Sequence, residues 1–221
     1  MTQIKAWLDY YNVKAKSSSK SISWVSGYHR KLATISKETH AQWYIMIRNK
    51  LKLNKKHLLL DVGCGAGFMT IPLLRYVDTI IGLDALQAML YRIPRKHRRI
   101  IKILSMADEM PLPDDYVDRV LCNSIFQYFS SYEYAKKVLK EMYRVCKPGG
   151  YIFVVDLPDK VKVKAYSTEL KKESFKHKNL KRILYEKRFF LKLFPKAKIF
   201  DQSIKGYGNS PFRFNVLIRK K

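Results

Sequence analysis

One run of acidic and glycine residues, 60–67 (LDVGCGAG), carries the strongest chemical signal in the 221-residue sequence. Glycine lets a backbone approach a ligand closely and adopt conformations that other residues resist. A short apolar run, residues 57–62, leads directly into this turn and predicts a buried strand. Because ligands bind at the carboxyl ends of strands in doubly wound sheets, we expect a binding site at this turn.

The spacing within this run excludes two common phosphate-binding motifs. The dinucleotide motif G-x-G-x-x-G has its third glycine three positions after the second, whereas Gly67 follows Gly65 by only two. No G-K-[ST] follows, so the turn is not a P-loop. Asp61 lies two residues before Gly63. Its carboxylate would repel a pyrophosphate and attract a cationic amino-acid group.

A second acid, Asp84, lies at the end of the next predicted strand, residues 79–84. An acid at this place hydrogen-bonds the hydroxyls of a ribose. The two acids together indicate a nucleoside that carries a positive, amino-acid-like group and no phosphate. S-adenosylmethionine has these features, so we expect it as the cofactor and S-adenosylhomocysteine as the product.

Alternating strand and helix patterns must position these acids. Near-continuous apolar strands that alternate with helices predict a parallel sheet covered on both faces. Two more strand candidates at the end of the chain, separated by the turn at 206–211, indicate an antiparallel pair. We therefore predict a doubly wound, Rossmann-like α/β fold with a mostly parallel seven-stranded sheet and an antiparallel C-terminal hairpin. The predicted strands are residues 57–62, 79–84, 100–104, 116–122, 151–156, 197–204 and 212–218, and the helices between them are residues 69–76, 86–91 and 131–146.

The predicted domain organisation has two parts. Residues 1–53 are expected to form an N-terminal helical lid, with helices at 2–12 and 26–53 joined by a flexible Ser/Lys-rich link. Residues 54–221 are expected to form the cofactor-binding domain. A basic segment at about 158–195 is predicted to be a mostly helical insertion beside the acceptor site.

Four motifs within residues 57–157 resemble, in order, those of the class I S-adenosylmethionine-dependent methyltransferases, and most of all the ubiquinone/menaquinone-type group. They are LLLDVGCGAG, IIGLDAL, MADEMPLPDDYVDRVLCNSIFQYF and LKEMYRVCKPGGYIFVVD. The resemblance implies a methyltransferase that moves a methyl group by in-line displacement. The cofactor carries the activated group, and the protein aligns the reactants.

The resemblance also implies a cofactor role for each matching position. The backbone of Gly63–Gly65, with Cys64 inside it, approaches the methionine part, and Asp61 lies near the amino group. Asp84 binds the ribose hydroxyls and Ala85 lines the adenine. The remaining implied positions are Ala107 and Asp108 at the adenine edge, and Asn123 and Gln127 near the methionine end.

Several departures from related families narrow the expected chemistry. Met106 stands where the family often has Asp, so adenine recognition is expected to depend on Asp108 or on the backbone. CNSI, residues 122–125, replaces the Asn/Asp-Pro-Pro-Tyr/Phe signature of amino-group methylation on nucleobases. Cys122 and Cys146 lack the Pro-Cys and Thr-Cys contexts of RNA cytosine methyltransferases, so a covalent intermediate is not expected. The cysteine spacing matches no metal site.

A sugar or aliphatic hydroxyl acceptor would need a general base. His29 and His40 are the candidate catalytic residues, with a surface or packing role as the alternative for each. Tyr28 is a candidate substrate-binding residue in the same region. Tyr207 and Arg213 are further substrate-binding candidates if the C-terminal turn lies at the ligand-binding edge. The alternative for them is an ordinary closing hairpin.

The net charge of +26, from 44 Lys and Arg against 18 acids, suggests nucleic acid or an anionic surface as a partner. The alternative is a solvated basic surface. We expect a small molecule or a glycan or natural-product precursor, methylated on oxygen or nitrogen. RNA methylation and a non-catalytic, cofactor-binding partner subunit remain as alternatives. Because no secretory signal or spanning helix is evident and three cysteines cannot all pair, we expect a cytoplasmic protein.

Overall fold

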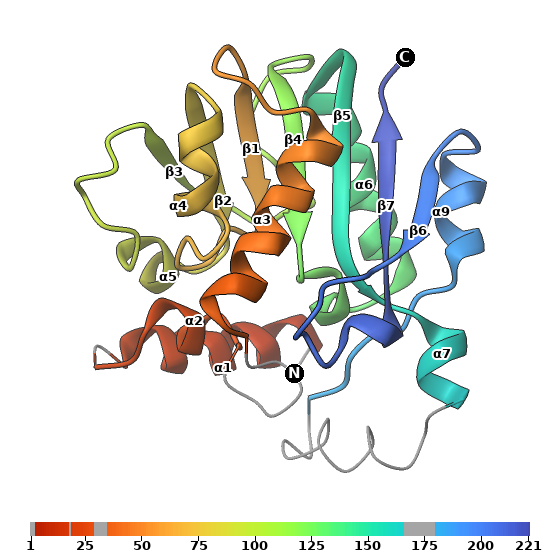
Figure 1. Ribbon diagram of the computed structural model, residues 1–221, viewed down its shortest axis with the longest axis horizontal. Coiled ribbons are helices and arrows are strands. Elements are labelled where there is room, and N and C mark those ends of the chain that lie inside the picture. Colours follow the sequence, from red (N-terminus) through yellow and green to blue (C-terminus); the bar gives the residue numbers. More distant parts are fainter. Residues whose placement is uncertain (1–2, 18, 29–34, 166–179) are drawn as a thin grey trace.

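A seven-stranded sheet forms the centre of the computed structural model, which describes residues 3–17, 19–28, 35–165 and 180–221 (Figure 1). The strand order is β3-β2-β1-β4-β5-β7-β6. The first five strands in this order pair in parallel, and β7 pairs antiparallel with both β5 and β6. The doubly wound fold with an antiparallel C-terminal pair is therefore confirmed. The strands are β1 (Leu58–Val62), β2 (Thr79–Asp84), β3 (Ile100–Leu104), β4 (Val117–Asn123), β5 (Cys146–Pro158), β6 (Lys198–Asp201) and β7 (Arg213–Arg219).

Helices cover both faces of this sheet and its lower edge. In Figure 1, α3 and α4 lie in front of the sheet, α6 lies behind it, and α1 and α2 lie beneath the lower ends of the parallel strands. None of the helices in the described ranges has the length and apolar character needed to cross a membrane. The helices are α1 (Gln3–Lys16), α2 (Ile22–Val25), α3 (Lys37–Leu51), α4 (Thr70–Leu73), α5 (Gln87–Tyr91), α6 (Tyr132–Val145), α7 (Lys160–Ala165) and α9 (Lys187–Leu193).

The apolar strands bury one core on each face of the sheet. Successive strand residues point to opposite faces. Leu59 therefore joins the core under α3, together with Trp43 and Ile47, whereas Leu60 joins the core under α6 and α9. Because both faces are covered, the central strands need apolar residues at almost every position.

Serine caps define where the two long helices against the sheet begin. The Ser36 hydroxyl accepts a hydrogen bond from the Thr39 amide at 3.1 Å, and the Ser131 hydroxyl accepts one from the Tyr134 amide at 3.0 Å. These bonds satisfy amides that have no partner within the helix. The caps place the start of α3 at Lys37 and that of α6 at Tyr132.

Two helical predictions at the N-terminus differ from the structure. The helix predicted for 26–53 begins only at Lys37, because Ser36 caps it there and residues 26–28 form a turn. Residues 29–34 lie outside the described residues. The predicted link at 13–23 is partly helical, since α1 continues to Lys16.

The basic segment 158–195 is helical only at its two ends within the described residues, at α7 and α9. Residues 180–186 between them contain no helix. Instead, the Tyr185 amide donates to the Pro158 carbonyl, and the buried Tyr185 ring packs in the core with Phe126 and Phe190. The prediction of a mostly helical insertion is therefore wrong for 180–186, while residues 166–179 lie outside the described part.

Candidate cofactor and acceptor site

A cavity with about 1020 Å³ of empty space, part of it open to solvent, lies where the parallel strands end and α1 crosses beneath them (Figure 1). The glycine turn, the ends of β2 and β4 and the inner side of α1 line it. The lining includes seven large aromatic residues: Trp7, Tyr11, Tyr28, Phe68, Tyr128, Phe129 and Tyr134.

The glycine turn forms one wall of the cavity. Gly63 has a φ of +72° and Gly65 a φ of +53°, a conformation that is strained for residues with a side chain. A Cβ added to Gly63 would lie 2.6 Å from Cγ2 of Ile125, whereas one added to Gly65 would meet no atom within 4 Å. Cys64 lies between them and is buried, and burial raises the pKa of its thiol.

Asp61, at the end of β1, is a buried carboxylate that faces the cavity without a cation. It is 2% exposed and accepts a hydrogen bond from the Thr70 hydroxyl at 2.6 Å. No ion pair among the described residues includes it. Burial raises the pKa of Asp61 to about 7, and the nearby charge of Asp84 adds to the effect. A cationic ligand group would therefore find an electrostatic partner here.

Asp84, at the end of β2, connects the first two strand ends. One carboxylate oxygen accepts a hydrogen bond from the Gly65 amide at 2.8 Å, and the other accepts one from the Leu86 amide at 2.9 Å. The carboxylate also lines the cavity. A carboxylate has about four lone-pair sites, so Asp84 keeps acceptor capacity for ligand hydroxyls while it fixes the glycine turn.

The predicted adenine-side residues divide into two groups. Ala85 and Ala107 line the cavity, as does Met106. Asp108 is not among the lining residues. Instead, its carboxylate accepts a hydrogen bond from the Tyr134 hydroxyl at 2.7 Å, and the Tyr134 ring reaches the cavity. Asp108 therefore positions Tyr134 rather than facing the cavity itself.

Asn123, at the end of β4, lines the opposite part of the cavity. Its Nδ2 donates a hydrogen bond to the Tyr28 hydroxyl at 3.2 Å, and its buried Oδ1 has no hydrogen-bond partner among the described residues. A buried polar atom without a partner is costly, and a ligand donor at this point would remove that cost. Tyr28 lines the same wall and stacks on Phe68 with ring centroids 4.4 Å apart.

Comparisons with known proteins agree with this geometry. Residues 60–154 match the family described as "Methyltransferase domain". A demethylmenaquinone methyltransferase of Geobacillus sp. (strain WCH70) is 30% identical over 137 residues, which cover 58% of this chain and 57% of that protein. The uncharacterized methyltransferase YcgJ of Bacillus subtilis (strain 168) is 29% identical over 106 residues, 46% of this chain and 41% of the relative. The chain thus spans about half the length of these curated relatives.

Solved structures show the same fold. The YcgJ structure has a TM-score of 0.60 at 21% identity and covers 74% of this chain and 71% of its own. Phosphoethanolamine N-methyltransferase 1 of Haemonchus contortus, in complex with phosphoethanolamine and S-adenosylhomocysteine, has a TM-score of 0.75 at 14% identity. The match covers 98% of this chain and 48% of that one.

The family match lies on the strands and turns that build the cavity. Residues 60–154 are a class I S-adenosylmethionine-dependent methyltransferase domain. S-adenosylmethionine is the cofactor of this domain.

Three features of the methyltransferase domain fit this cofactor. Asp61 is a buried carboxylate that lacks a cation. Gly65 leaves open space beside the cavity where any other residue would place a Cβ. The Oδ1 atom of Asn123 is buried without a partner. An amino-acid group with a positive charge and hydrogen-bond donors would satisfy both polar groups, and the open glycine turn leaves room for it.

Three other predicted ligand-binding residues do not line the cavity. Gln127 is buried and accepts a hydrogen bond from Nη1 of Arg213 at 2.6 Å. Arg213 lies 3.6 Å from an Asp156 carboxylate oxygen, and the Tyr207 hydroxyl donates to the same carboxylate at 3.2 Å. The C-terminal turn packs against the side of the cavity wall that faces away from the cavity. Gln127, Tyr207 and Arg213 therefore form a buried network rather than a ligand-facing surface.

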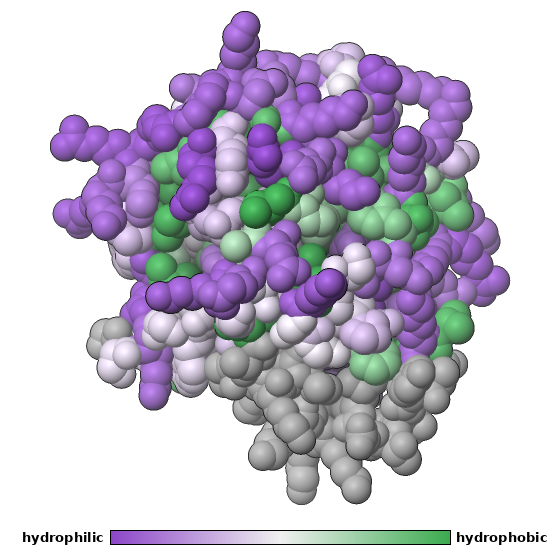
Figure 2. Space-filling view, in the orientation of Figure 1, coloured by the Kyte–Doolittle hydropathy of each residue, from purple (hydrophilic) through white to green (hydrophobic). Residues whose placement is uncertain are grey.

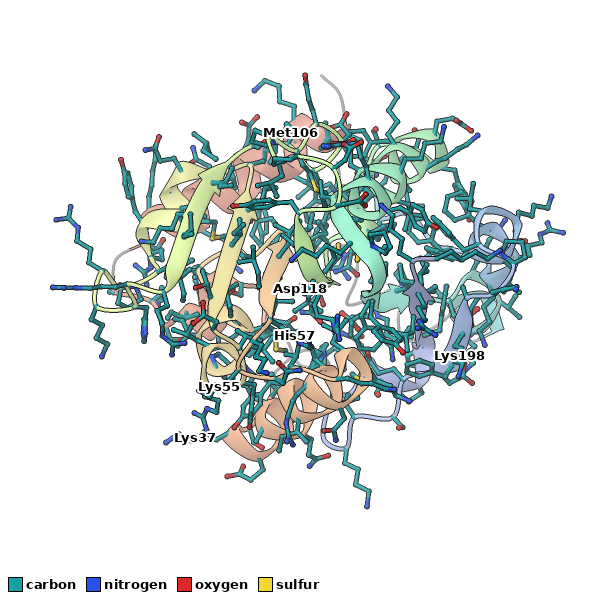
Figure 3. The ribbon with its side chains drawn as sticks, turned by 90° about the horizontal axis from the view of Figure 1, so that it is seen from above. Lys37, Lys55, His57, Met106, Asp118 and Lys198 are labelled. Carbon is teal, nitrogen blue, oxygen red and sulfur yellow. The ribbon has the colours of Figure 1, made fainter. Side chains whose placement is uncertain are left out.

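The candidate histidine bases do not lie at the cavity within the described residues. The His40 ring stacks on Phe68 at 3.9 Å, and its Nε2 hydrogen-bonds the Phe68 carbonyl at 2.9 Å. Burial lowers the pKa of His40, and the ring holds α3 against the glycine turn. His29 lies outside the described residues. His57 lies beside Asp118 at the other end of the sheet, seen from above in Figure 3.

Trp7, Tyr11 and Tyr128 are among the cavity residues that were absent from the predicted site. Trp7 and Tyr11 of α1 pack against Tyr128 of the turn after β4, with centroids 4.6 Å and 5.3 Å away. The signal was present, because aromatic residues at helical spacing marked the inner side of the first helix. What the sequence does not reveal is the long-range contact that brings this helix to the strand ends.

Proposed function

We propose that this protein is an S-adenosylmethionine-dependent methyltransferase that methylates an oxygen or nitrogen atom of a small, largely apolar molecule. One observation carries the choice of acceptor. Among the lining residues that the structure describes, aromatic and aliphatic side chains predominate and none is Lys or Arg, although the chain has a net charge of +26. An RNA phosphate or an anionic sugar precursor would find no cation there to replace its hydration.

Relatives support this acceptor class. The Geobacillus protein is named for demethylmenaquinone, and a spinach protein that is 33% identical over 103 residues is named for 2-methyl-6-phytyl-1,4-hydroquinone. Aromatic lining suits ring acceptors, which pack against other rings in offset or edge-to-face arrangements. We therefore favour a ring compound over a glycan precursor.

The residues of this chain would hold the cofactor at three points. Asp61 would pair with the amino group, and Asp84 would accept hydrogen bonds from the ribose hydroxyls. Ala85 and Ala107 would pack on the adenine. We propose that α1 acts as a lid that completes the cavity from below, because its Trp7 and Tyr11 line it.

Bound S-adenosylmethionine supplies a methyl group already activated by its sulfonium. The protein must align the acceptor atom with that methyl group and exclude water, and ideal alignment lowers a barrier by up to ~7–11 kcal/mol. The aromatic wall formed by Trp7, Tyr11 and Tyr128 is placed to do both. It is tied together by a hydrogen bond of 2.7 Å between the hydroxyls of Tyr11 and Tyr128.

Incubation of the purified protein with methyl-labelled S-adenosylmethionine and fractionated cell extract tests the proposal. The label should enter a small-molecule fraction whose mass rises by one methylene. At a cofactor concentration near the wild-type dissociation constant, Asp61→Asn protein should show far less transfer, which controls for contaminating enzymes. Label in purified RNA instead would support the RNA alternative. Cofactor binding without transfer to any fraction would support a partner subunit.

We also propose that the protein acts in the cytoplasm. The cysteines Cys64, Cys122 and Cys146 are all buried free thiols. A reducing compartment keeps thiols in this state.

A further inference from the structure

Two strained residues face each other at the tips of neighbouring strands. Ser124, directly after β4, has a φ of +60°, and Asp156, near the end of β5, has a φ of +65°. Residues other than glycine rarely take this conformation, and such strain is concentrated at functional sites. The Ser124 hydroxyl donates a hydrogen bond to the Asp156 carboxylate. The hydrogen bond thus joins the side chains of two strained residues, which follow the paired residues Asn123 and Val155 of β4 and β5.

Asp156 is a buried carboxylate that accepts several hydrogen bonds and lies beside a guanidinium. It is 2% exposed and accepts hydrogen bonds from Nε2 of Gln202 at 3.1 Å and from the Tyr207 hydroxyl at 3.2 Å. Nε of Arg213 lies 3.6 Å from its Oδ1. The guanidinium compensates the buried charge. The remaining titratable groups that act on this network are Tyr28 and Tyr128.

A chain of hydroxyls leads from this carboxylate into the cavity. The Tyr28 hydroxyl donates to Oγ of Ser124 at 3.1 Å and accepts from Nδ2 of Asn123 at 3.2 Å. Tyr28, Ser124 and Asn123 all line the cavity, whereas Asp156 lies one hydrogen bond behind its wall. A hydroxyl oxygen has two lone pairs. The second lone pair of Tyr28 is therefore available to an acceptor in the cavity.

We propose that Tyr28 and Ser124 relay a proton from a hydroxyl acceptor to Asp156 during methyl transfer. This inference rests on the proposed function and narrows its acceptor to a ring compound with a reacting hydroxyl. The acceptor oxygen forms a bond to the methyl carbon as the carbon–sulfur bond breaks, and sulfur keeps the electron pair. The acceptor proton moves to Tyr28, the Tyr28 proton moves to Ser124, and the Ser124 proton moves to Asp156.

The charges balance in this step. The sulfonium loses its positive charge and the Asp156 carboxylate loses its negative charge, so the net charge of the site does not change. Burial raises the pKa of Tyr28 well above its usual value, so this hydroxyl stays protonated before and after the step and passes a proton on rather than losing one. An amine acceptor with a free lone pair would not need such a relay.

A matched pair of probes tests the relay with methyl-labelled S-adenosylmethionine at pH 8. Phenol needs help to lose its proton, whereas benzenethiol ionises readily and presents the same ring. Tyr28→Phe, Ser124→Ala and Asp156→Asn should each lower the rate on phenol by about 10²–10⁴-fold. The same variants should change the rate on benzenethiol by less than about threefold, because only proton removal is lost. A merely structural role would lower both rates together.

Tyr132→Phe serves as the control, because it removes a hydroxyl that donates to the Leu184 carbonyl outside the cavity. It should leave both rates unchanged. Asp156→Asn could unfold because Arg213 loses its partner. Tyr28→Phe would then still test the relay, since its ring keeps the stack on Phe68.

Equal losses on both probes would overturn the relay. The proposal of a hydroxyl acceptor would be overturned if the wild-type protein methylated benzenethiol but not phenol. It would also be overturned if neither probe were methylated while a compound in the extract was. A wild-type protein that binds no S-adenosylmethionine by calorimetry would contradict the proposed function itself.

Discussion

The buried carboxylate of Asp61 makes cofactor binding depend on pH. Its pKa is raised to about 7 by burial, whereas an unfolded Asp titrates near ~4. Below pH 7 the free protein therefore holds a proton that a cationic amino group must displace. We expect the affinity for S-adenosylhomocysteine to fall by up to about tenfold per pH unit below 7 and to level off above it. Calorimetric titrations from pH 5.5 to 8.5 measure this dependence.

Asp61→Asn should weaken the affinity for S-adenosylhomocysteine and remove its pH dependence. Loss of a hydrogen bond to a charged group predicts an affinity about 10–100-fold weaker at pH 8. The change should also stabilise the ligand-free protein between about pH 4 and pH 8. The folded state of the wild type binds the extra proton in this range, so its stability falls as pH rises. Asp78→Asn, on the exposed surface, is the control, and an unchanged pH profile in Asp61→Asn would contradict the assignment.

Alanine substitutions at two glycines of the same turn should affect the free energy of unfolding and cofactor binding to different extents. Gly63→Ala brings a Cβ within 2.6 Å of Ile125 at a φ of +72°, so we expect a loss of about 2–5 kcal/mol in unfolding free energy. Gly65→Ala meets no atom within 4 Å, so the backbone alone contributes about 1–2 kcal/mol. Its methyl group extends toward the cavity and should weaken cofactor binding by at least about tenfold. Urea unfolding and calorimetry measure the two effects; equal stability losses would contradict this account.

At the scale of elements, the sequence predicts the parallel strands well because each is a short apolar run that ends in a polar turn. Asp61 and Asp84 end β1 and β2 as expected, since register follows from burial on both faces. The start of α3 was less predictable. Apolar residues continue upstream of Ser36 at helical spacing, and only the serine cap and the turn at 26–28 show that the helix begins later.

The network behind the cavity could not be predicted from the sequence. It joins the turn after β4, the end of β5 and the start of β7 through Gln127, Asp156 and Arg213. These residues are separated by up to 86 positions. Their contact depends on the order β4-β5-β7 and on an irregularity of register between Val154 and Leu157. Neither leaves a periodic pattern in the sequence.

The docking of α1 should depend on one aromatic contact. Trp7 packs on Tyr128, and its Nε1 donates to the Lys181 carbonyl at 2.8 Å. Trp7→Ala should speed hydrogen exchange of the α1 amides by about tenfold or more, because the helix loses its main apolar anchor, while the sheet amides stay protected. Val13→Ala on the exposed side of the same helix should not do so. Equal protection in both variants would show that other contacts hold the helix.

At the scale of the whole molecule, the positive charge is separated from the cavity. Hydrophilic side chains cover most of the face that carries α3 (Figure 2). At the amino-terminal end of the strands, Lys147 pairs with Asp118 and Lys220 with Asp115. The described cavity lining contains no Lys or Arg. A charge distribution of this kind favours non-specific attraction of polyanions to the outside of the protein and does not assist their entry into the cavity.

RNA should therefore bind weakly to the surface and leave the cavity open. With six to ten phosphate contacts, affinity for a single-stranded RNA should fall by about 10²–10⁴-fold between 50 and 200 mM salt. Saturating RNA should not change the affinity for S-adenosylhomocysteine, because the cations lie outside the lining. Fluorescence anisotropy of labelled RNAs of different sequence, followed by cofactor titration of the RNA complex, measures both. Sequence-selective binding that resists salt, or competition with the cofactor, would favour RNA over a small molecule as the acceptor.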